Sequence, residues 1–181
     1  MDLASIVQSI ESSALGEWMR LSLKAMPVVE SIHVMAIAVV FGTILIVDLR
    51  ILGFPNTRRP YTLVARELLR FTWVAFVVAA ITGAMMFAAN ASTYFDNTAF
   101  RFKMLALVAA GVNVVVFYGF TGRTVSSWDK DARPPLAARL SGATSLVIWL
   151  AVIFLGRWIG FTKGYDFAVP EDFELELDFL E

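Results

Sequence analysis

Four long stretches of this chain are almost entirely apolar, and they constrain its fold more than any other feature. The stretches are residues 27–51, 68–89, 100–120 and 138–161. Between Val34 and Val47 the first of them has no charged residue. A helix needs roughly 20 mostly apolar residues to cross the hydrocarbon core of a bilayer. The sequence therefore predicts an all-α membrane protein, a four-transmembrane-helix bundle.

The composition agrees with this prediction and excludes several kinds of site. Apolar residues make up 58% and charged residues 17% of the chain, against roughly 45–50% and 25% in soluble domains. The net charge of −1 gives no basic surface for nucleic acid. With no cysteine and one histidine, one copy has no thiolate nucleophile and no multi-histidine metal site. Soluble-enzyme motifs such as GxSxG and HExxH are absent, so we lean against an enzyme.

The distribution of lysine and arginine predicts the orientation. Nine of the fifteen basic residues lie in or beside the first and third loops, which share one side of a four-span protein. Positive residues favour the cytoplasmic side. We therefore predict a multi-pass protein of the bacterial inner membrane with both termini in the periplasm.

Two shorter segments flank the bundle, so the chain divides into residues 1–26, 27–162 and 163–181. In the first segment, apolar residues recur at helical spacing at Leu3, Ile6, Val7 and Ile10. We predict amphipathic helices with a break at Gly16, lying in the membrane interface. The alternative is that these helices pack on the end of the bundle.

The C-terminal tail alternates apolar and acidic residues. Its apolar positions are Phe173, Leu175, Leu177 and Phe179. A period of two is typical of a strand, which would add to the sheet edge of another protein or pair with a second copy. A disordered acidic tail is the alternative. We treat the four apolar residues as candidate interaction residues on the outer side of the membrane.

His33 is the leading candidate for chemistry. It lies six residues inside the first stretch, roughly 9 Å along a helix, and ionisable residues at such depth often mark functional sites. A neutral imidazole can ligate haem iron or copper, or relay protons. The alternative is a histidine hydrogen-bonded to a neighbouring helix. Glu30, three residues earlier, either orients the imidazole as a hydrogen-bond acceptor or is an interfacial carboxylate.

Two cations are predicted to lie in the same outer half of the bundle. Lys103 enters the third stretch and Arg157 lies in the last third of the fourth. An imidazole beside cations would suit a haem, whose propionates need positive partners, and the same cations would suit another anionic ligand. The alternative is that both side chains extend to the membrane surface.

Other polar residues of the stretches are interpreted as structural. We expect Asn113 to hydrogen-bond a neighbouring helix. We expect Asp48 to meet an arginine of another helix, such as Arg70. Pairs of small residues four apart, such as Gly156 with Gly160 and Ala79 with Gly83, permit close helix packing.

Four strings carry a family resemblance when taken together. They are His33 to Gly42 followed by Asp48-Leu49-Arg50, Phe71-Thr72-Trp73 with Thr82-Gly83, Ala99 to Lys103, and Gly156 to Ile159. They resemble an uncharacterised family of small four-span bacterial membrane proteins, described only as a domain of unknown function. The resemblance covers about residues 27–162 and leaves out the N-terminal segment and the tail.

The chain is also distantly similar to the HemJ-type protoporphyrinogen oxidases and the CopD-type copper proteins. Those proteins place a histidine in an early helix and a lysine at the start of a later one. The resemblance implies an axial haem ligand for His33 and a pocket position for Lys103. Where relatives often have a second histidine, near the end of the third span, this chain has Tyr118. One copy therefore cannot supply two histidine ligands.

Two functional hypotheses follow. The favoured one is a non-enzymatic scaffold or assembly subunit that forms a homo-oligomer or a membrane-protein complex. The alternative is a membrane redox or cofactor-binding protein that holds haem b through His33. A lipid or solute carrier ranks last, because the four stretches hold few polar groups to line a path.

Overall fold

The computed structural model describes residues 2–54, 59–131 and 133–162. Four of its helical stretches are long and apolar enough to cross a membrane. They are α3 (Ala25–Leu52), α4 (Tyr61–Ala89), the stretch Thr98–Trp128 that begins with α6 (Thr98–Val116), and α8 (Leu136–Thr162). The four predicted long apolar helical stretches are confirmed, and by length and composition each could cross a membrane.

One boundary differs from the prediction, because α4 begins at Tyr61 and not near residue 68. Its first turns carry Arg66, Glu67 and Arg70. Because these residues are charged, a helix start predicted from apolar length falls after them. The backbone is nevertheless helical from Tyr61 onwards.

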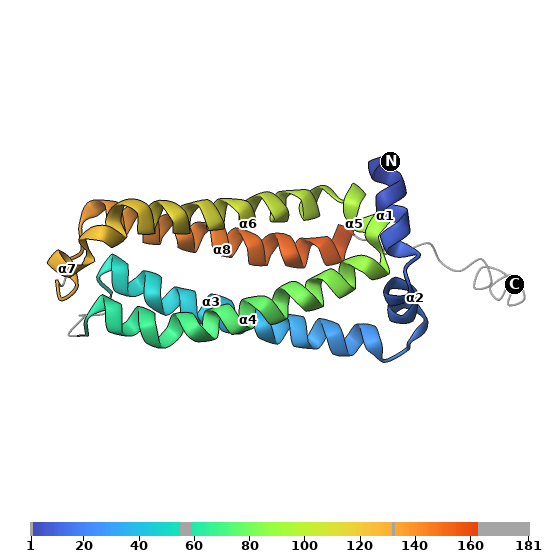
Figure 1. Ribbon diagram of the computed structural model, residues 1–181, viewed down its shortest axis with the longest axis horizontal. Helices are drawn as coiled ribbons and strands as arrows, with labels where there is room; N and C mark the ends of the chain where they lie inside the picture. The colour runs from blue at the N-terminus through green and yellow to red at the C-terminus, as the bar shows by residue number, and fades with distance from the viewer. Residues whose placement is uncertain (1, 55–58, 132, 163–181) are drawn as a thin grey trace, which may run out of the picture.

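The long helices form two antiparallel pairs that run side by side along the molecule (Figure 1). One pair is α3 with α4 and the other is α6 with α8, and α3 also contacts α8. The approach of α8 to α3 depends on Gly142. A Cβ atom there would lie 3.3 Å from Ile51 Cγ2 and 3.4 Å from the Asp48 carbonyl oxygen. The lack of a side chain at Gly142 therefore allows α8 of one pair to approach α3 of the other.

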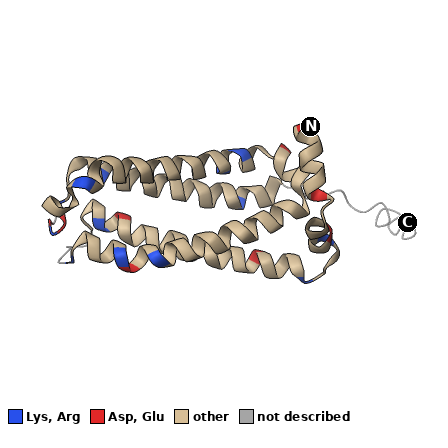
Figure 2. Ribbon diagram, viewed as in Figure 1, with Lys and Arg blue, Asp and Glu red and all other residues tan. Residues whose placement is uncertain are grey.

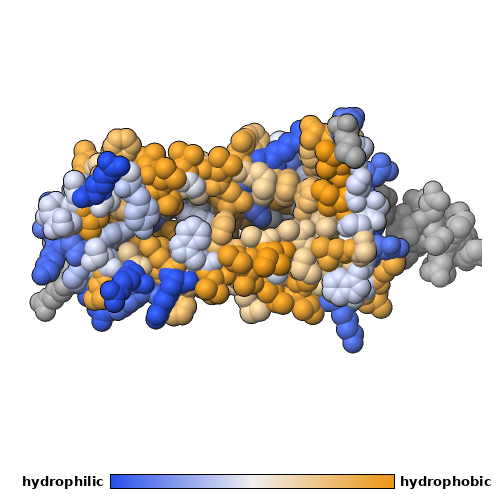
Figure 3. All heavy atoms as spheres, viewed as in Figure 1, coloured by the Kyte–Doolittle hydropathy of each residue, from blue (hydrophilic) through white to orange (hydrophobic). Residues whose placement is uncertain are grey.

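Charged and apolar residues are divided along the length of the bundle. In Figure 2 most charged residues lie towards the two ends, and Figure 3 shows apolar side chains over much of the middle. On α6 the exposed apolar residues include Leu105, Val108, Val112 and Val115. Exposure of this kind is expected where the neighbouring solvent is lipid.

The end of the bundle at loops one and three is closed by aromatic side chains and by short irregular turns. A π-helical segment, Phe117–Thr121, follows α6, and then come a 3-10 turn and α7 (Val125–Trp128). The ring of Tyr61 packs against Phe117 and Trp128 at centroid distances of 5.9 and 5.4 Å. These residues belong to a buried cluster with Val47 and Ile51 of α3.

Two short helices, α1 (Leu3–Glu11) and α2 (Ala14–Leu21), lie across the opposite end of the bundle (Figure 1). There α1 contacts α5 (Ala91–Asp96), and α2 contacts α4. The helices thus pack on the bundle end, which was the alternative expected for this segment. Their placement in a membrane interface stays a prediction.

The predicted break at Gly16 is wrong, because the chain breaks at Ser12 and Ser13 and Gly16 is buried within α2. The Ser13 side chain accepts a hydrogen bond from the Gly16 N–H at 3.2 Å and so caps α2. A Cβ atom on Gly16 would lie 2.5 Å from the Glu11 carbonyl oxygen and 2.6 Å from that of Ala88. The glycine is needed for close approach and not for a bend.

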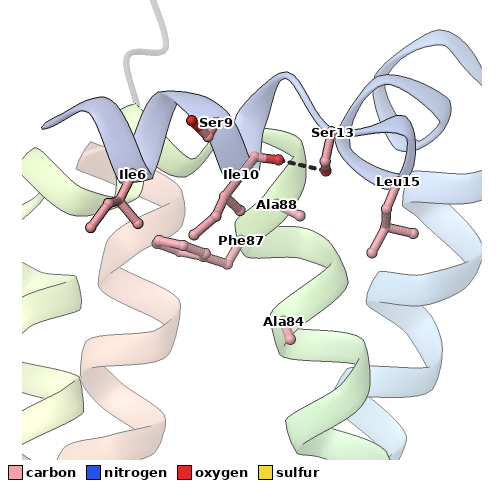
Figure 4. Close-up of a pocket in the computed structure, with 8 residues that line it drawn as sticks. All are labelled: Ile6, Ser9, Ile10, Ser13, Leu15, Ala84, Phe87 and Ala88. Atoms are coloured by element: carbon pink, nitrogen blue, oxygen red, sulfur yellow. Dashed lines mark hydrogen bonds between the residues drawn. The ribbon is translucent and has the colours of Figure 1, made fainter. Parts of the chain in front are cut away.

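An open apolar groove of about 630 Å³ lies beneath α1. In Figure 4, Ile6 and Ile10 of α1 lie close to Phe87 of α4, and Leu15 of α2 is on the far side. Ser9, Ser13, Ala84 and Ala88 complete the lining.

Polar contacts fix the short helices to the bundle. The Arg20 guanidinium donates to the carbonyl oxygens of Glu11 and Ala89, both at 2.8 Å. The Glu11 carboxylate accepts a hydrogen bond from the Ser92 N–H at 2.8 Å. The Arg20–Glu11 contact joins α2 to α1, whereas the Arg20–Ala89 and Glu11–Ser92 contacts join the N-terminal segment to the end of α4 and to α5.

The Glu11 contact predicts a pH-dependent contribution to stability. Hydrogen bonding from Ser92 holds the pKa of Glu11 below its usual range, so the stabilisation is full above the unfolded pKa of about 4.3 and disappears as the pH falls through the folded value. We expect wild type to be more stable than Glu11→Gln at pH 7, with the difference shrinking as the pH falls below about 4.3 and vanishing below the folded pKa. Thermal unfolding in detergent across this range measures it. A constant difference at every pH would contradict the prediction.

The polar residues inside the bundle follow the sequence predictions in part. Asn113 is confirmed as a link to a neighbouring helix: its Nδ2 donates to the Ser141 carbonyl oxygen at 3.1 Å, and the Ser141 hydroxyl donates to its Oδ1 at 3.0 Å. The predicted contact of Asp48 with Arg70 is wrong. Arg70 is exposed, and its guanidinium lies 4.7 Å from the Phe71 ring centroid. Asp48 is buried where α3 meets α8.

Candidate functional site

His33 projects from α3 towards α4, where it meets Thr82. Its Nδ1 lies 2.9 Å from the Thr82 hydroxyl oxygen. The same hydroxyl lies 2.7 Å from the Val78 carbonyl oxygen and 3.2 Å from that of Ala79, either of which can accept its single hydrogen. When it donates to one of these carbonyls, it accepts from the His33 Nδ1–H, because a threonine hydroxyl has one hydrogen and two lone pairs. A neutral His33 in this pairing has its lone pair on Nε2.

The next residue of α4, Gly83, makes room for the imidazole. A Cβ atom on Gly83 would lie 3.1 Å from His33 Cε1 and 3.6 Å from Nδ1. The dipeptide Thr82-Gly83 thus provides both the acceptor for the ring and the surface on which the ring lies. The hydrogen bond also confirms the structural alternative for His33, a contact with a neighbouring helix.

Lys103 reaches the interior from α6 and lies against α8. A Cβ atom on Gly156 would be 3.6 Å from the Lys103 Nζ. Lys103 is partly buried, and its charge acts on His33. Within residues 2–54, 59–131 and 133–162, its ammonium group makes no ion pair or hydrogen bond. A cation without an anionic neighbour in an apolar bundle is a candidate binding group.

The site takes one contribution from each long helix. His33, Thr82, Lys103 and Gly156 lie five to eight residues from the helix ends nearest α1 and α2, which is roughly 8–12 Å along each helix. We name these four residues with Gly83 the outer-half site. The sequence analysis predicted the common depth of His33 and Lys103.

Glu30 and Arg157 are placed differently. Thr82, and not Glu30, is the hydrogen-bond partner at His33 Nδ1. Glu30 is exposed, and its negative charge, after burial, helps raise the pKa of Tyr94 to about 12. Arg157 is also exposed, with its guanidinium 5.1 Å from the Phe161 ring centroid. The structure therefore brings together His33 and Lys103, with Arg157 beside Phe161.

Thr82, Gly83 and Gly156 were not predicted as site residues. The sequence showed both glycines as small residues at helix-packing spacing, and it showed Thr82-Gly83 as part of a characteristic string. That signal could not tell which side chains the small residues face. The candidate interaction residues Phe173, Leu175, Leu177 and Phe179 lie outside the described part of the chain.

The comparison with known families is consistent with the fold. A family model described as a family of unknown function (DUF6644) matches residues 6–162. The chain belongs to this family. The match includes α2 and most of α1, so residues 6–26, which the sequence resemblance left out, lie within the family match.

No curated protein and no solved structure matches the chain. The expected similarity to the HemJ-type and CopD-type proteins therefore receives no support.

Proposed function

We propose that this chain is a multi-pass membrane protein that binds a ligand in the outer-half site, with His33 and Lys103 as the binding groups. The observation that carries the proposal is the hydrogen bond between His33 and Thr82. With Thr82 as the acceptor, Nδ1 is the donor and the Nε2 lone pair is left to ligate a metal or accept a proton. The Lys103 ammonium, which has no ion pair or hydrogen bond among the described residues, adds the preference for an anionic group.

Haem b is the ligand that we favour. A ligating histidine usually gives its other ring N–H to an oxygen acceptor, which fixes the ring orientation, and Thr82 supplies that acceptor. Lys103 has the charge that a propionate requires. In the described residues, no three histidine, cysteine, aspartate or glutamate side chains gather to hold a bare metal ion. A prosthetic group that needs one protein ligand fits this donor set. When bound, haem would supply redox chemistry at its iron.

In this proposal each residue has a separate task. His33 binds the metal through Nε2 and Thr82 fixes the ring. Gly83 leaves space for the ring, and Lys103 neutralises the acidic edge of the ligand against Gly156. An apolar bundle would also keep water from the group, which tunes its potential.

We place the protein in the bacterial inner membrane with the outer-half site towards the periplasm. The four apolar helices support a multi-pass membrane protein. The basic residues near loops one and three lie at the end away from α1 and α2 (Figure 2), and positive residues favour the cytoplasm. Exposed Leu3, Trp18 and Leu21 on the short helices support an interfacial position at the outer face.

The absorbance spectrum of detergent-purified protein, before and after addition of haem b, tests the proposal. We expect a Soret band in wild type and its loss in His33→Ala. Thr82→Val keeps the side-chain shape but removes the acceptor, so haem affinity should fall about 10–100-fold. Lys103→Met should weaken binding without removing the iron ligand.

Gly111→Ala is the matched control, because nothing lies within 4 Å of a Cβ atom at Gly111. It should bind haem as wild type does. Wild-type protein that stays colourless after haem addition would refute the haem proposal, and so would an unchanged band in His33→Ala.

The scaffold or assembly function expected from the sequence stays a prediction, as do the predicted homo-oligomer and membrane-protein complex. It depends mainly on the acidic tail, residues 163–181, which lies outside the described residues.

A further inference from the structure

Asp48 is a buried carboxyl group at the end of the bundle opposite to the outer-half site. It lies on α3, four residues before Leu52, and its exposed fraction is 6%. Its Oδ2 has no hydrogen-bond partner among the described residues. It is fifteen residues from His33, roughly 22 Å along the helix. The group is therefore separate from the proposed ligand site.

The nearest arginine in sequence does not neutralise Asp48. Residues two apart on a helix do not face each other, and Arg50 uses its guanidinium elsewhere. It donates to the carbonyl oxygens of Arg59 at 2.8 Å and Asp129 at 3.0 Å. In the part of the chain that the structure describes, the one ion pair is Arg101 with Asp96. Asp48 therefore has no cationic partner there.

The groups around Asp48 are neutral or acidic. Ser145 of α8 interacts with the Asp48 carboxyl. Gly142, one turn earlier on α8, lets the two helices approach closely enough for this contact. The buried Tyr61 of α4 interacts electrostatically with Asp48. Tyr61 also interacts with Tyr118 of the π-helical segment and, electrostatically, with Asp129 of the third loop.

The surroundings make an ionised Asp48 costly. A buried carboxylate without a cation or a full set of hydrogen-bond donors is strongly disfavoured, and such groups become neutral instead. A protonated carboxyl needs no cation and fewer hydrogen-bond donors, because it is neutral and can donate one hydrogen bond and accept another. The π-helical segment, whose Phe117 ring packs against Tyr61, is a second unusual feature, since such segments occur frequently at functional sites.

We propose that Asp48 is a proton-binding site that holds its proton at neutral pH. Asp48 of α3, Ser145 of α8 and Tyr61 of α4 build it, and Tyr118 of the third helical stretch interacts with Tyr61. The ligand class is a proton rather than a metal cation, because Ser145 and Tyr61 offer hydroxyl groups and, within the described residues, no three His, Cys, Asp or Glu side chains gather to hold a metal ion.

Infrared spectroscopy of the full chain in lipid vesicles at pH 7 tests this proposal. We expect a carbonyl-stretch band of a protonated carboxylic acid in wild type. Asp48→Asn should remove that band completely. Ser145→Ala should keep the band but move it to higher frequency, because the carboxyl loses a hydrogen bond.

Asp96→Asn is the matched control, since Asp96 is exposed and lies 3.6 Å from Arg101; it should leave the band unchanged. His33→Ala should also leave it unchanged, which separates this result from the haem experiment. Absence of the band in wild type overturns the proposal, as does its persistence in Asp48→Asn. An ionised Asp48 carboxylate whose band shifts on addition of sodium would overturn it too, because it would indicate a cation site. If Asp48→Asn does not fold, an unshifted band in Ser145→Ala overturns it as well.

Discussion

Gly16→Ala is expected to separate α2 from α4 and to destabilise the protein by about 1–3 kcal/mol or more. The added Cβ would lie 2.5 Å from the Glu11 carbonyl oxygen and 2.6 Å from the Ala88 carbonyl oxygen. Both neighbours are backbone atoms, so neither can move by a simple side-chain rotation. Relief requires α2 to move away, and with it the Arg20 contact with Ala89. Thermal unfolding followed by circular dichroism in detergent measures the loss.

Gly111→Ala provides the comparison for this prediction. It lies within α6, where no atom would come within 4 Å of the new Cβ. Alanine is preferred over glycine inside a helix by roughly 0.5–1 kcal/mol, so this variant should be as stable as wild type or slightly more stable. Equal unfolding of Gly16→Ala and Gly111→Ala would show that α2 can leave α4 without cost.

Arg50→Ala should be the most damaging arginine substitution in the bundle, with a loss of about 3 kcal/mol or more. Arg50 is 4% exposed and donates to three backbone carbonyl oxygens, those of Arg59, Asp129 and Asp131. These carbonyls belong to loops one and three, so a single guanidinium joins both loops to α3. Alanine would leave the acceptors without their donor. The free energy of unfolding, measured by denaturant titration in mixed micelles, gives the size of the effect.

Two other arginine variants make that prediction specific. Arg50→Lys should recover only part of the stability, because an ammonium group cannot reproduce the spacing of a guanidinium fork. Arg70→Ala removes an exposed arginine that stacks on Phe71, and should cost less than about 1 kcal/mol. A loss in Arg70→Ala as large as that in Arg50→Ala would mean that net charge, and not the loop contacts, sets the stability.

The four long helices could be predicted from the sequence because apolar length is a local property. Their exact ends could not, and α4 gained two turns beyond its apolar part because helical hydrogen bonds continue through Arg66 and Arg70. The break in the N-terminal segment was misplaced for a different reason. Glycine was interpreted as a helix breaker, whereas Gly16 serves an approach between backbones that are more than seventy residues apart in the chain.

The candidate sites likewise combine features that are local in the sequence with contacts that depend on the fold. The sequence alone singled out His33 and Lys103, because an imidazole and an ammonium inside apolar stretches stand out by type and depth, whereas it gave Asp48 only a structural role. The neighbours of all three became known from the packing of the helices: Thr82 for His33, Gly156 for Lys103 and Ser145 for Asp48. It also decided that Arg157 lies over Phe161 at the surface. The physical reason is the rotation of each helix about its axis. Residues are distributed around a helix, and only its packing against neighbouring helices sets which side faces inward.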